Sequence, residues 1–184
     1  MLTIGVLGTV LALLSAGVLA WGLDKWNNIT TVALDVAGPA DGGEPSNWLL
    51  VGSDSREGVD PDNPYAGFIL GEGVPAGKRT DTIMVVRVDP DAGVVHLLSL
   101  PRDLYVTYPD GGEGRINATF VGEGGEQRLL ATVEQTFGIE INNYAEINFA
   151  GFQDIVDAIG GIPIWFDQPL RDSGSGLNVT SAGC

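Results

Sequence analysis

An uncharged, largely apolar run extends from Leu2 to Leu23 and constrains this chain more than any other feature. As an α-helix, its 22 residues rise about 1.5 Å each and match the roughly 30 Å hydrocarbon core of a bilayer. Trp21 and Trp26 flank its end, where indole rings favour the membrane interface. The sequence therefore predicts one transmembrane anchor over residues 1–23.

A cleavable signal peptide is the alternative interpretation of this run. Val18 and Ala20 would supply the small residues of a cleavage site, although the run is long for the apolar region of a signal. Both interpretations export everything that follows Lys25. We therefore expect a single-pass protein of the cell membrane with an extracytoplasmic domain.

The charge balance excludes a broad nucleic-acid surface. The chain has a formal net charge of −15 and only nine Lys and Arg residues, whereas phosphate neutralisation needs clustered cations. An anionic ligand would have to be bound where those few arginines are concentrated. The single cysteine, Cys184, cannot form a disulfide within the chain.

The anchor is followed by a spacer over residues 24–46, which is rich in Gly and Pro and begins with a possible short strand at 30–34. The folded domain is predicted over residues 47–184. Apolar or β-branched runs predict strands at 48–51, 82–88, 94–100 and 104–108. Residues 89–93, Asp-Pro-Asp-Ala-Gly, have the composition of a hairpin turn.

Helical periodicity occurs only in the second half. It predicts helices at 125–137 and 149–159, with strands at 143–147 and 162–166. An early hairpin combined with later strand–helix crossovers predicts an α/β sandwich with a mixed sheet. The tail from Asp167 is polar and ends without a predicted closing element, so the domain is expected to be truncated at its C-terminus.

Three short polar segments stand where predicted strands end, and each pairs an arginine with an aspartate: Gly52–Arg56, Arg79–Thr82 and Leu100–Asp103. Ligand sites of open α/β sheets gather at strand ends. Two carboxylates suit Mg²⁺, and the planar fork of arginine suits pyrophosphate. Surface ion pairs and turn residues are the alternative, and composition alone does not decide between the two.

These segments make the chain recognisable. NWLLVGSDSR, RTDTIMVVRVDP, LLSLPRDLYV, GRINATF and FAGFQDIVDAIGGIPI resemble the LytR-CpsA-Psr family in order and spacing, over about residues 47–172. The resemblance implies a three-layer α/β/α sandwich in a membrane-anchored extracytoplasmic enzyme. It also implies a phosphotransferase, which moves a glycopolymer phosphate from a polyprenyl-pyrophosphate carrier to peptidoglycan.

The same resemblance assigns roles by position. Asp54 and Asp81 look like the family's Mg²⁺ ligands, and Arg79 and Arg102 look like its pyrophosphate-binding arginines. Asp103 is similar to the acidic neighbour that orients Arg102 or serves as a base, with Asp81 the next candidate for the base.

Two further arginines are weaker matches. Arg56 is a pyrophosphate contact by its place in the first motif, and Arg115 stands where the family more often has lysine. A downstream Tyr-Val-Arg-x-Arg type motif would lie beyond Cys184, so this chain is expected to hold only part of the site. A non-catalytic lipid or glycan binding module and an envelope-linked transcriptional attenuator are the alternative functions.

Leu129, Val133, Phe152 and Ile155 are candidates for an apolar lipid tunnel, and ordinary core packing explains each of them as well. His96 lies inside a predicted strand and is interpreted as structural.

Overall fold

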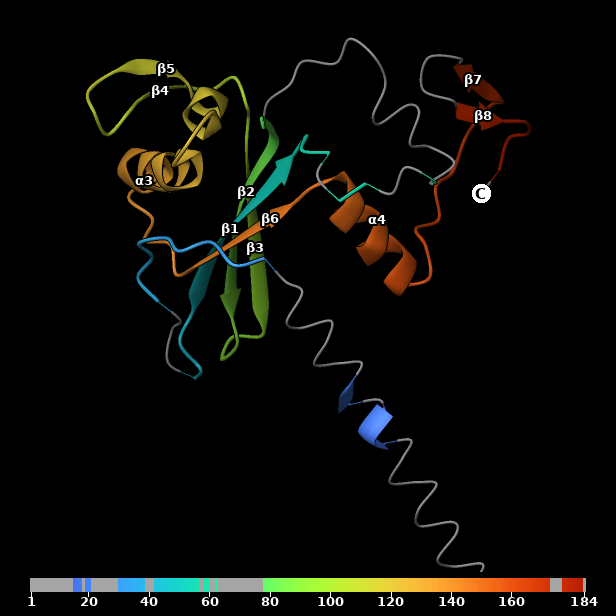
Figure 1. Ribbon diagram of the computed structural model, residues 1–184, viewed down its shortest axis with the longest axis horizontal. Coiled ribbons are helices and arrows are strands. Elements are labelled where there is room, and N and C mark those ends of the chain that lie inside the picture. Colours follow the sequence, from blue (N-terminus) through green and yellow to red (C-terminus); the bar gives the residue numbers. More distant parts are fainter. Residues whose placement is uncertain are drawn as a thin grey trace, which may run out of the picture. The chain divides into compact units, whose positions relative to one another are not determined.

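The computed structural model describes residues 15–17, 19–20, 30–38, 42–56, 58–59, 62, 78–172 and 177–183 (Figure 1). The chain divides into two compact units, Met1–Leu34 and Asp35–Cys184. In the first unit, residues 15–17 and 19–20 are helical, and residues 30–34 do not form the expected strand. Across the described residues, no helix is both long enough and apolar enough to cross a membrane. Most of the predicted anchor lies outside the described residues.

The second unit is built on a mixed sheet of four strands in the order β3-β2-β1-β6. These strands are β1 (Ser46–Ser53), β2 (Thr80–Asp89), β3 (Val94–Leu100) and β6 (Asn143–Ile147). β1 pairs antiparallel with β2 and parallel with β6, and β2 pairs antiparallel with β3. The prediction of a mixed α/β fold is therefore confirmed.

One face of the sheet forms the core. Alternate residues of the two central strands share this face, and among them Leu49, Val51, Ile83 and Val85 are buried. Helix α3 (Gly125–Phe137) and the short 3₁₀ helix η1 (Ile116–Phe120) supply the other half of the core. Burying each large apolar side chain contributes about 1.5–3 kcal/mol.

Glycine sets both limits of α3. Gly124 and Gly138 adopt left-handed conformations with φ of 69° and 63°, which residues with a Cβ rarely adopt. The helix turns Leu129, Leu130 and Val133 into the core, as its apolar spacing predicts. The hairpin of β4 (Tyr105–Thr107) and β5 (Glu113–Arg115) precedes η1.

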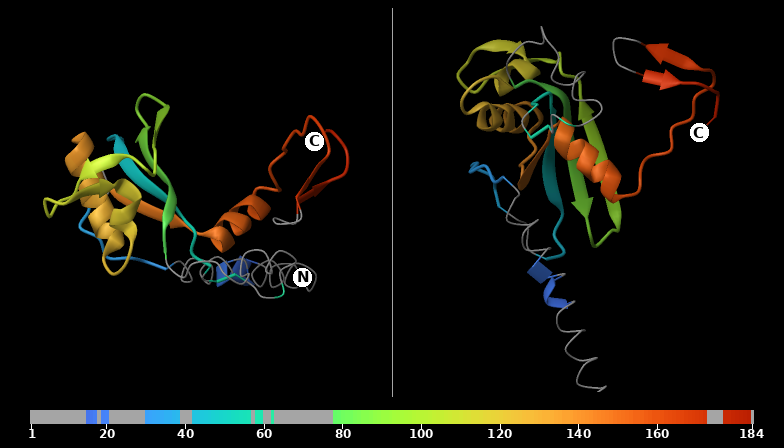
Figure 2. Two further views of the ribbon diagram at one scale, coloured as in Figure 1. Left: turned by 90° about the horizontal axis from the view of Figure 1, so that it is seen from above. Right: turned by 45° about the vertical axis from the view of Figure 1, so that its right-hand side comes forward.

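Helix α4 (Phe149–Ala158) leaves the end of β6 on the side away from α3 (Figure 2). The side chain of Asn148 caps it by accepting a hydrogen bond from the amide of Gly151, at 2.9 Å. No residue of α4 is buried, and Phe152 and Ile155 are 56% and 48% exposed. The interpretation of core packing is therefore wrong for Phe152 and Ile155, whereas Leu129 and Val133 do lie in the core. A second helical layer stays a prediction.

The C-terminal part departs from the predictions. Residues 162–166 form no strand, because Pro163 has no amide to donate and no neighbouring strand is present in the described residues. Phe166 makes only an isolated bridge with Gly183. The polar tail contains a hairpin that was not predicted, β7 (Leu170–Asp172) with β8 (Leu177–Val179).

Candidate functional site

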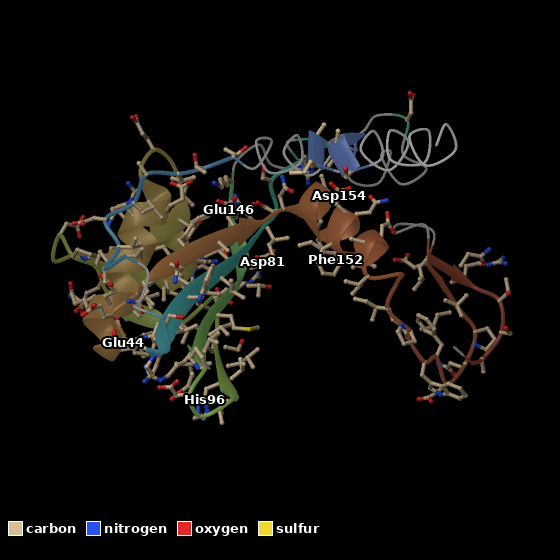
Figure 3. All side chains as sticks on the ribbon, turned by 90° about the horizontal axis from the view of Figure 1, so that it is seen from below. Glu44, Asp81, His96, Glu146, Phe152 and Asp154 are labelled. Atoms are coloured by element: carbon tan, nitrogen blue, oxygen red, sulfur yellow. The ribbon has the colours of Figure 1, made fainter. Side chains whose placement is uncertain are left out.

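A β-bulge in β2 presents Asp81. Gly52 pairs with Thr82 and Ser53 with Thr80, so Asp81 is the extra residue of its strand. Buried Thr80 closes the bulge by donating its hydroxyl to the carbonyl oxygens of Gly52 and Thr82, at 3.1 and 2.9 Å. Bulges redirect side chains next to functional sites. Figure 3 shows Asp81 near the same end of the sheet as Glu146, and His96 towards the other end.

Asp54 and Arg79 extend the β1–β2 pairing through reciprocal hydrogen bonds. The amide of Arg79 donates to Oδ1 of Asp54 at 2.7 Å, and the amide of Asp54 donates to the carbonyl of Arg79 at 3.0 Å. The Arg79 side chain is exposed, and its guanidinium has no ion-pair partner within the described part of the chain. The Asp54–Arg79 pair therefore presents one carboxylate and one available cation beside the bulge.

Four side chains of alternating charge extend the site to the β4–β5 hairpin: Asp81, Arg102, Asp103 and Arg115. Nη1 of Arg102 donates to Oδ1 of Asp81 at 2.5 Å, and its Nε lies 3.6 Å from Oδ2 of Asp103. Arg115 donates to Oδ1 of Asp103 at 3.1 Å. Hydrogen bonding to Asp81 and the charges of both aspartates raise the pKa of Arg102. All four side chains are more than half exposed, so a ligand can reach them.

Arg56 lies just beyond the end of β1. Its Nε atom is buried, and among the described residues nothing accepts a hydrogen bond from it. A buried donor without an acceptor is unfavourable, which fits a position that an anionic ligand completes.

The donor set fits Mg²⁺ in type. Asp54 directly follows β1 and Asp81 lies in the adjacent strand β2, and each uses only Oδ1 in the hydrogen bonds described above. Mg²⁺ is often held by one or two carboxylates together with substrate phosphates and water. Within the described ranges, no group of three or more His, Cys, Asp and Glu residues could hold a metal by itself. Substrate oxygens and water would have to complete the coordination.

His96 does not contribute to this site. It lies exposed on β3, the edge strand of the sheet, opposite Arg87 of β2.

Sequence reasoning missed a second cluster, on the α3 side of the sheet. Nζ of Lys78 lies 2.6 Å from a carboxylate oxygen of Glu126 and 2.6 Å from one of Glu146. It also lies 4.9 Å from the ring centroid of Phe120. Tyr144 donates its hydroxyl to Glu146 at 3.2 Å, and burial together with that carboxylate raises the pKa of Tyr144. The partners of Lys78 are far from it in sequence, so the basic pair Lys78-Arg79 was the only local signal of this cluster.

These features define a class of protein: a mixed-sheet α/β domain that presents alternating aspartates and arginines at a bulged strand end. Residues 24–181 match the LytR_cpsA_psr family, and the chain belongs to that family. The predicted family membership is therefore confirmed.

Two relatives illustrate the likeness. The probable cell wall biosynthesis protein LcpB of Corynebacterium glutamicum is 40% identical, covering 98% of this chain and 43% of that protein. A polyisoprenyl-teichoic acid–peptidoglycan teichoic acid transferase, TagU of Oceanobacillus iheyensis, is 34% identical, covering 70% of this chain and 36% of that protein. The chain thus spans less than half the length of these relatives.

Solved structures share the fold. Bacillus subtilis TagV matches with a TM-score of 0.56 and 25% identity, covering 77% of this chain and 51% of that one. A LytR-CPS2A-psr family protein, YwtF (TagT), with bound octaprenyl pyrophosphate lipid, matches with a TM-score of 0.57 and 19% identity. That match covers 83% of this chain and 60% of the other, and at this identity it shows the fold alone.

Proposed function

We propose that this chain acts as a phosphotransferase that moves a glycopolymer phosphate from a polyprenyl-pyrophosphate carrier to peptidoglycan. The observation that carries the proposal is the alternation of Asp81, Arg102, Asp103 and Arg115, with Asp54 and Arg79 beside it. The transferase names of relatives that are 30–34% identical support the reaction class. The localisation proposed with it is the outer side of a cell membrane.

The arginines have the chemistry that a pyrophosphate needs. Planar guanidinium groups make two parallel hydrogen bonds to phosphate oxygens, and these bonds strengthen as charge develops during transfer. Arg79 makes no ion pair with any of the described residues, whereas Arg102 has to loosen from Asp81. Arg56 and Arg115 are further contacts in this proposal.

Asp54 and Asp81 would hold Mg²⁺ in this proposal. The ion would neutralise part of the negative charge on the pyrophosphate. The hydrogen bond that Asp54 accepts from the amide of Arg79 orients its carboxylate, and the bulge turns Asp81 out of the strand. Both carboxylates are therefore positioned by backbone features.

In the proposed reaction, a sugar hydroxyl of the acceptor attacks the phosphorus that bears the glycopolymer. A new oxygen–phosphorus bond forms, the bond to the bridging oxygen breaks, and polyprenyl phosphate leaves. The proton of the hydroxyl goes to a carboxylate. Arg102 and Arg115 contact both oxygens of Asp103, which suits a role in orienting the arginines. Asp81 is itself held by Arg102, so Asp103 and Asp81 are both kept as candidates for the base.

The test is a transfer assay with labelled lipid-pyrophosphate glycan, peptidoglycan and Mg²⁺. We expect labelled peptidoglycan with the unaltered protein, and a loss of at least about a hundredfold with Arg102→Ala and with Asp81→Ala. Arg87→Ala, which removes an exposed arginine at the other end of β2, is the matched control. Unchanged transfer in the first two variants contradicts the site. Lipid binding without transfer in the unaltered protein supports a binding module instead.

A further inference from the structure

Lys78 directly precedes Arg79, and a basic pair at this place suggests two phosphate ligands. The ammonium group of Lys78 is directed elsewhere. It is held by Glu126 in the first turn of α3 and by Glu146 near the end of β6, at 2.6 Å in each case. One side chain thus joins the start of β2 to a helix and to a strand.

The surroundings of this ammonium group are partly buried. The two carboxylate side chains are only 18% and 16% exposed, and the ring of Phe120 lies beneath the ammonium group. Burial by itself would lower the pKa of Lys78, but the hydrogen bonds and charges of Glu126 and Glu146 outweigh it and raise the pKa. Lys78 is therefore charged and engaged by two carboxylates, which leaves it poorly placed to bind a phosphate.

The tether bears on the candidate site through the backbone. Arg79, the next residue, donates its amide to Asp54 and accepts the amide of Asp54 with its carbonyl. Two residues further on, Asp81 forms the bulge. Fixing Lys78 against α3 and β6 therefore limits how far the Asp54–Arg79 pair can move.

We propose that Lys78 is a positioning residue, whose ion pairs with Glu126 and Glu146 hold the Asp54–Arg79 pair in place. Its effect on ligand affinity rests on the proposed function, whereas its effect on the pair does not. The residue acts through Arg79 and Asp54 and does not touch the ligand.

The variants separate the tether from the charge. Lys78→Met removes the tether and leaves two carboxylates without their cation, which changes the charge of the cluster from −1 to −2. The double variant Lys78→Met/Glu126→Gln also lacks the tether but restores the charge of −1. Lys78→Arg keeps a cation that can contact both carboxylates. Glu126→Gln alone removes one of the two ion pairs, in case the loss of Lys78 prevents folding.

The first measurement is amide hydrogen exchange at Arg79 and Asp54 by NMR. The amides of Leu50 and Val85, which lie in the two central strands, report on the whole sheet. We expect exchange at Arg79 and Asp54 to accelerate about tenfold in Lys78→Met and in the double variant, and about threefold in Glu126→Gln. Lys78→Arg should stay near the unaltered rate, and Leu50 and Val85 should change little. Unaltered exchange at Arg79 and Asp54 in the variants without Lys78 overturns the proposal.

The second measurement is the affinity for octaprenyl pyrophosphate in the presence of Mg²⁺. We expect the two variants that lack the lysine, Lys78→Met and Lys78→Met/Glu126→Gln, to bind about tenfold more weakly, and Lys78→Arg to restore binding. Full recovery in the double variant would mean that charge alone matters, and would overturn the positioning role. If the unaltered protein binds no lipid, the proposed function fails, and the exchange rates alone decide on the tether.

Discussion

Arg102 donates a hydrogen bond to Oδ1 of Asp81 at 2.5 Å. An arginine that is proposed to bind pyrophosphate therefore contacts a carboxylate that is proposed to bind Mg²⁺. If Asp81 holds Mg²⁺ as proposed, a cation and Arg102 would compete for the same carboxylate in the ligand-free protein. When pyrophosphate binds, its oxygens can take over the guanidinium and release Asp81. This relationship couples the two halves of the proposed site.

Arg102→Gln should separate these halves. Without the competing guanidinium, we expect the affinity of the ligand-free protein for Mg²⁺ to rise about two- to fivefold, because the lost ion pair is exposed and weak. The affinity for octaprenyl pyrophosphate should fall in the same variant. Calorimetric titration measures both. Arg87→Gln removes the same charge elsewhere, and an equal gain in Mg²⁺ affinity there would contradict competition at Asp81.

Asp54→Asn tests the charge of the other proposed metal ligand without removing its hydrogen bond. The amide oxygen of asparagine can still accept the bond that Arg79 donates to Oδ1. We expect a normal fold and Mg²⁺ affinity lowered by about tenfold or more. Asp54→Ala, which also loses the acceptor, should in addition lower the free energy of unfolding by about 1 kcal/mol. Unchanged Mg²⁺ affinity in Asp54→Asn would exclude Asp54 as a ligand.

The well-predicted elements have strong local signals. The helix at Gly125–Phe137 combines apolar spacing with a glycine at its end, and the strand at Asn143–Ile147 lies between two helical patterns. The apolar residues 162–166 looked equally like a strand, but a strand needs a partner, and the pattern of one segment does not show whether a partner exists. The polar hairpin of β7 and β8 carried no apolar alternation to reveal it.

In the candidate site, too, the features with a local signal were predictable and those that depend on distant segments were not. Motifs in the sequence predict Asp54, Arg79, Asp81 and Arg102 as a group, and the structure joins them as two pairs, Asp54 with Arg79 and Asp81 with Arg102. The bulge at Asp81 was not predictable, because it depends on how β1 and β2 are aligned. The tether from Lys78 was hidden for a related reason: Glu126 and Glu146 lie 48 and 68 residues away along the chain.

Gly125→Ala tests the close approach of η1 to α3. A Cβ atom at this position would lie 2.0 Å from the backbone oxygen of Phe120, which cannot rotate away. We expect the variant to lower the free energy of unfolding by about 3 kcal/mol, because η1 has to move out of the core. Urea denaturation measures the change. Gly42→Ala, where nothing lies within 4 Å, should change stability by less than about 0.5 kcal/mol.

The Lys78–Glu126 ion pair should make stability depend on pH in a defined direction. Burial alone would raise the pKa of Glu126, but the hydrogen bond with Lys78, a backbone hydrogen bond and the charges of Lys78 and Arg128 together outweigh burial and lower the pKa. A carboxylate with a lowered pKa contributes stability above its unfolded pKa and loses it as pH falls through the folded value. We therefore expect Glu126→Gln to be less stable than the unaltered protein at neutral pH, by up to about 1 kcal/mol because the pair is partly exposed. The difference should shrink towards zero by about pH 3. It should persist into alkaline solution, because the pKa of Lys78 is raised above 10.5.

Urea denaturation at several pH values measures the difference, with Glu123→Gln at an exposed position as the charge-matched control. A difference that stays constant from neutral pH to about pH 3 would show that the ion pair contributes nothing to folding.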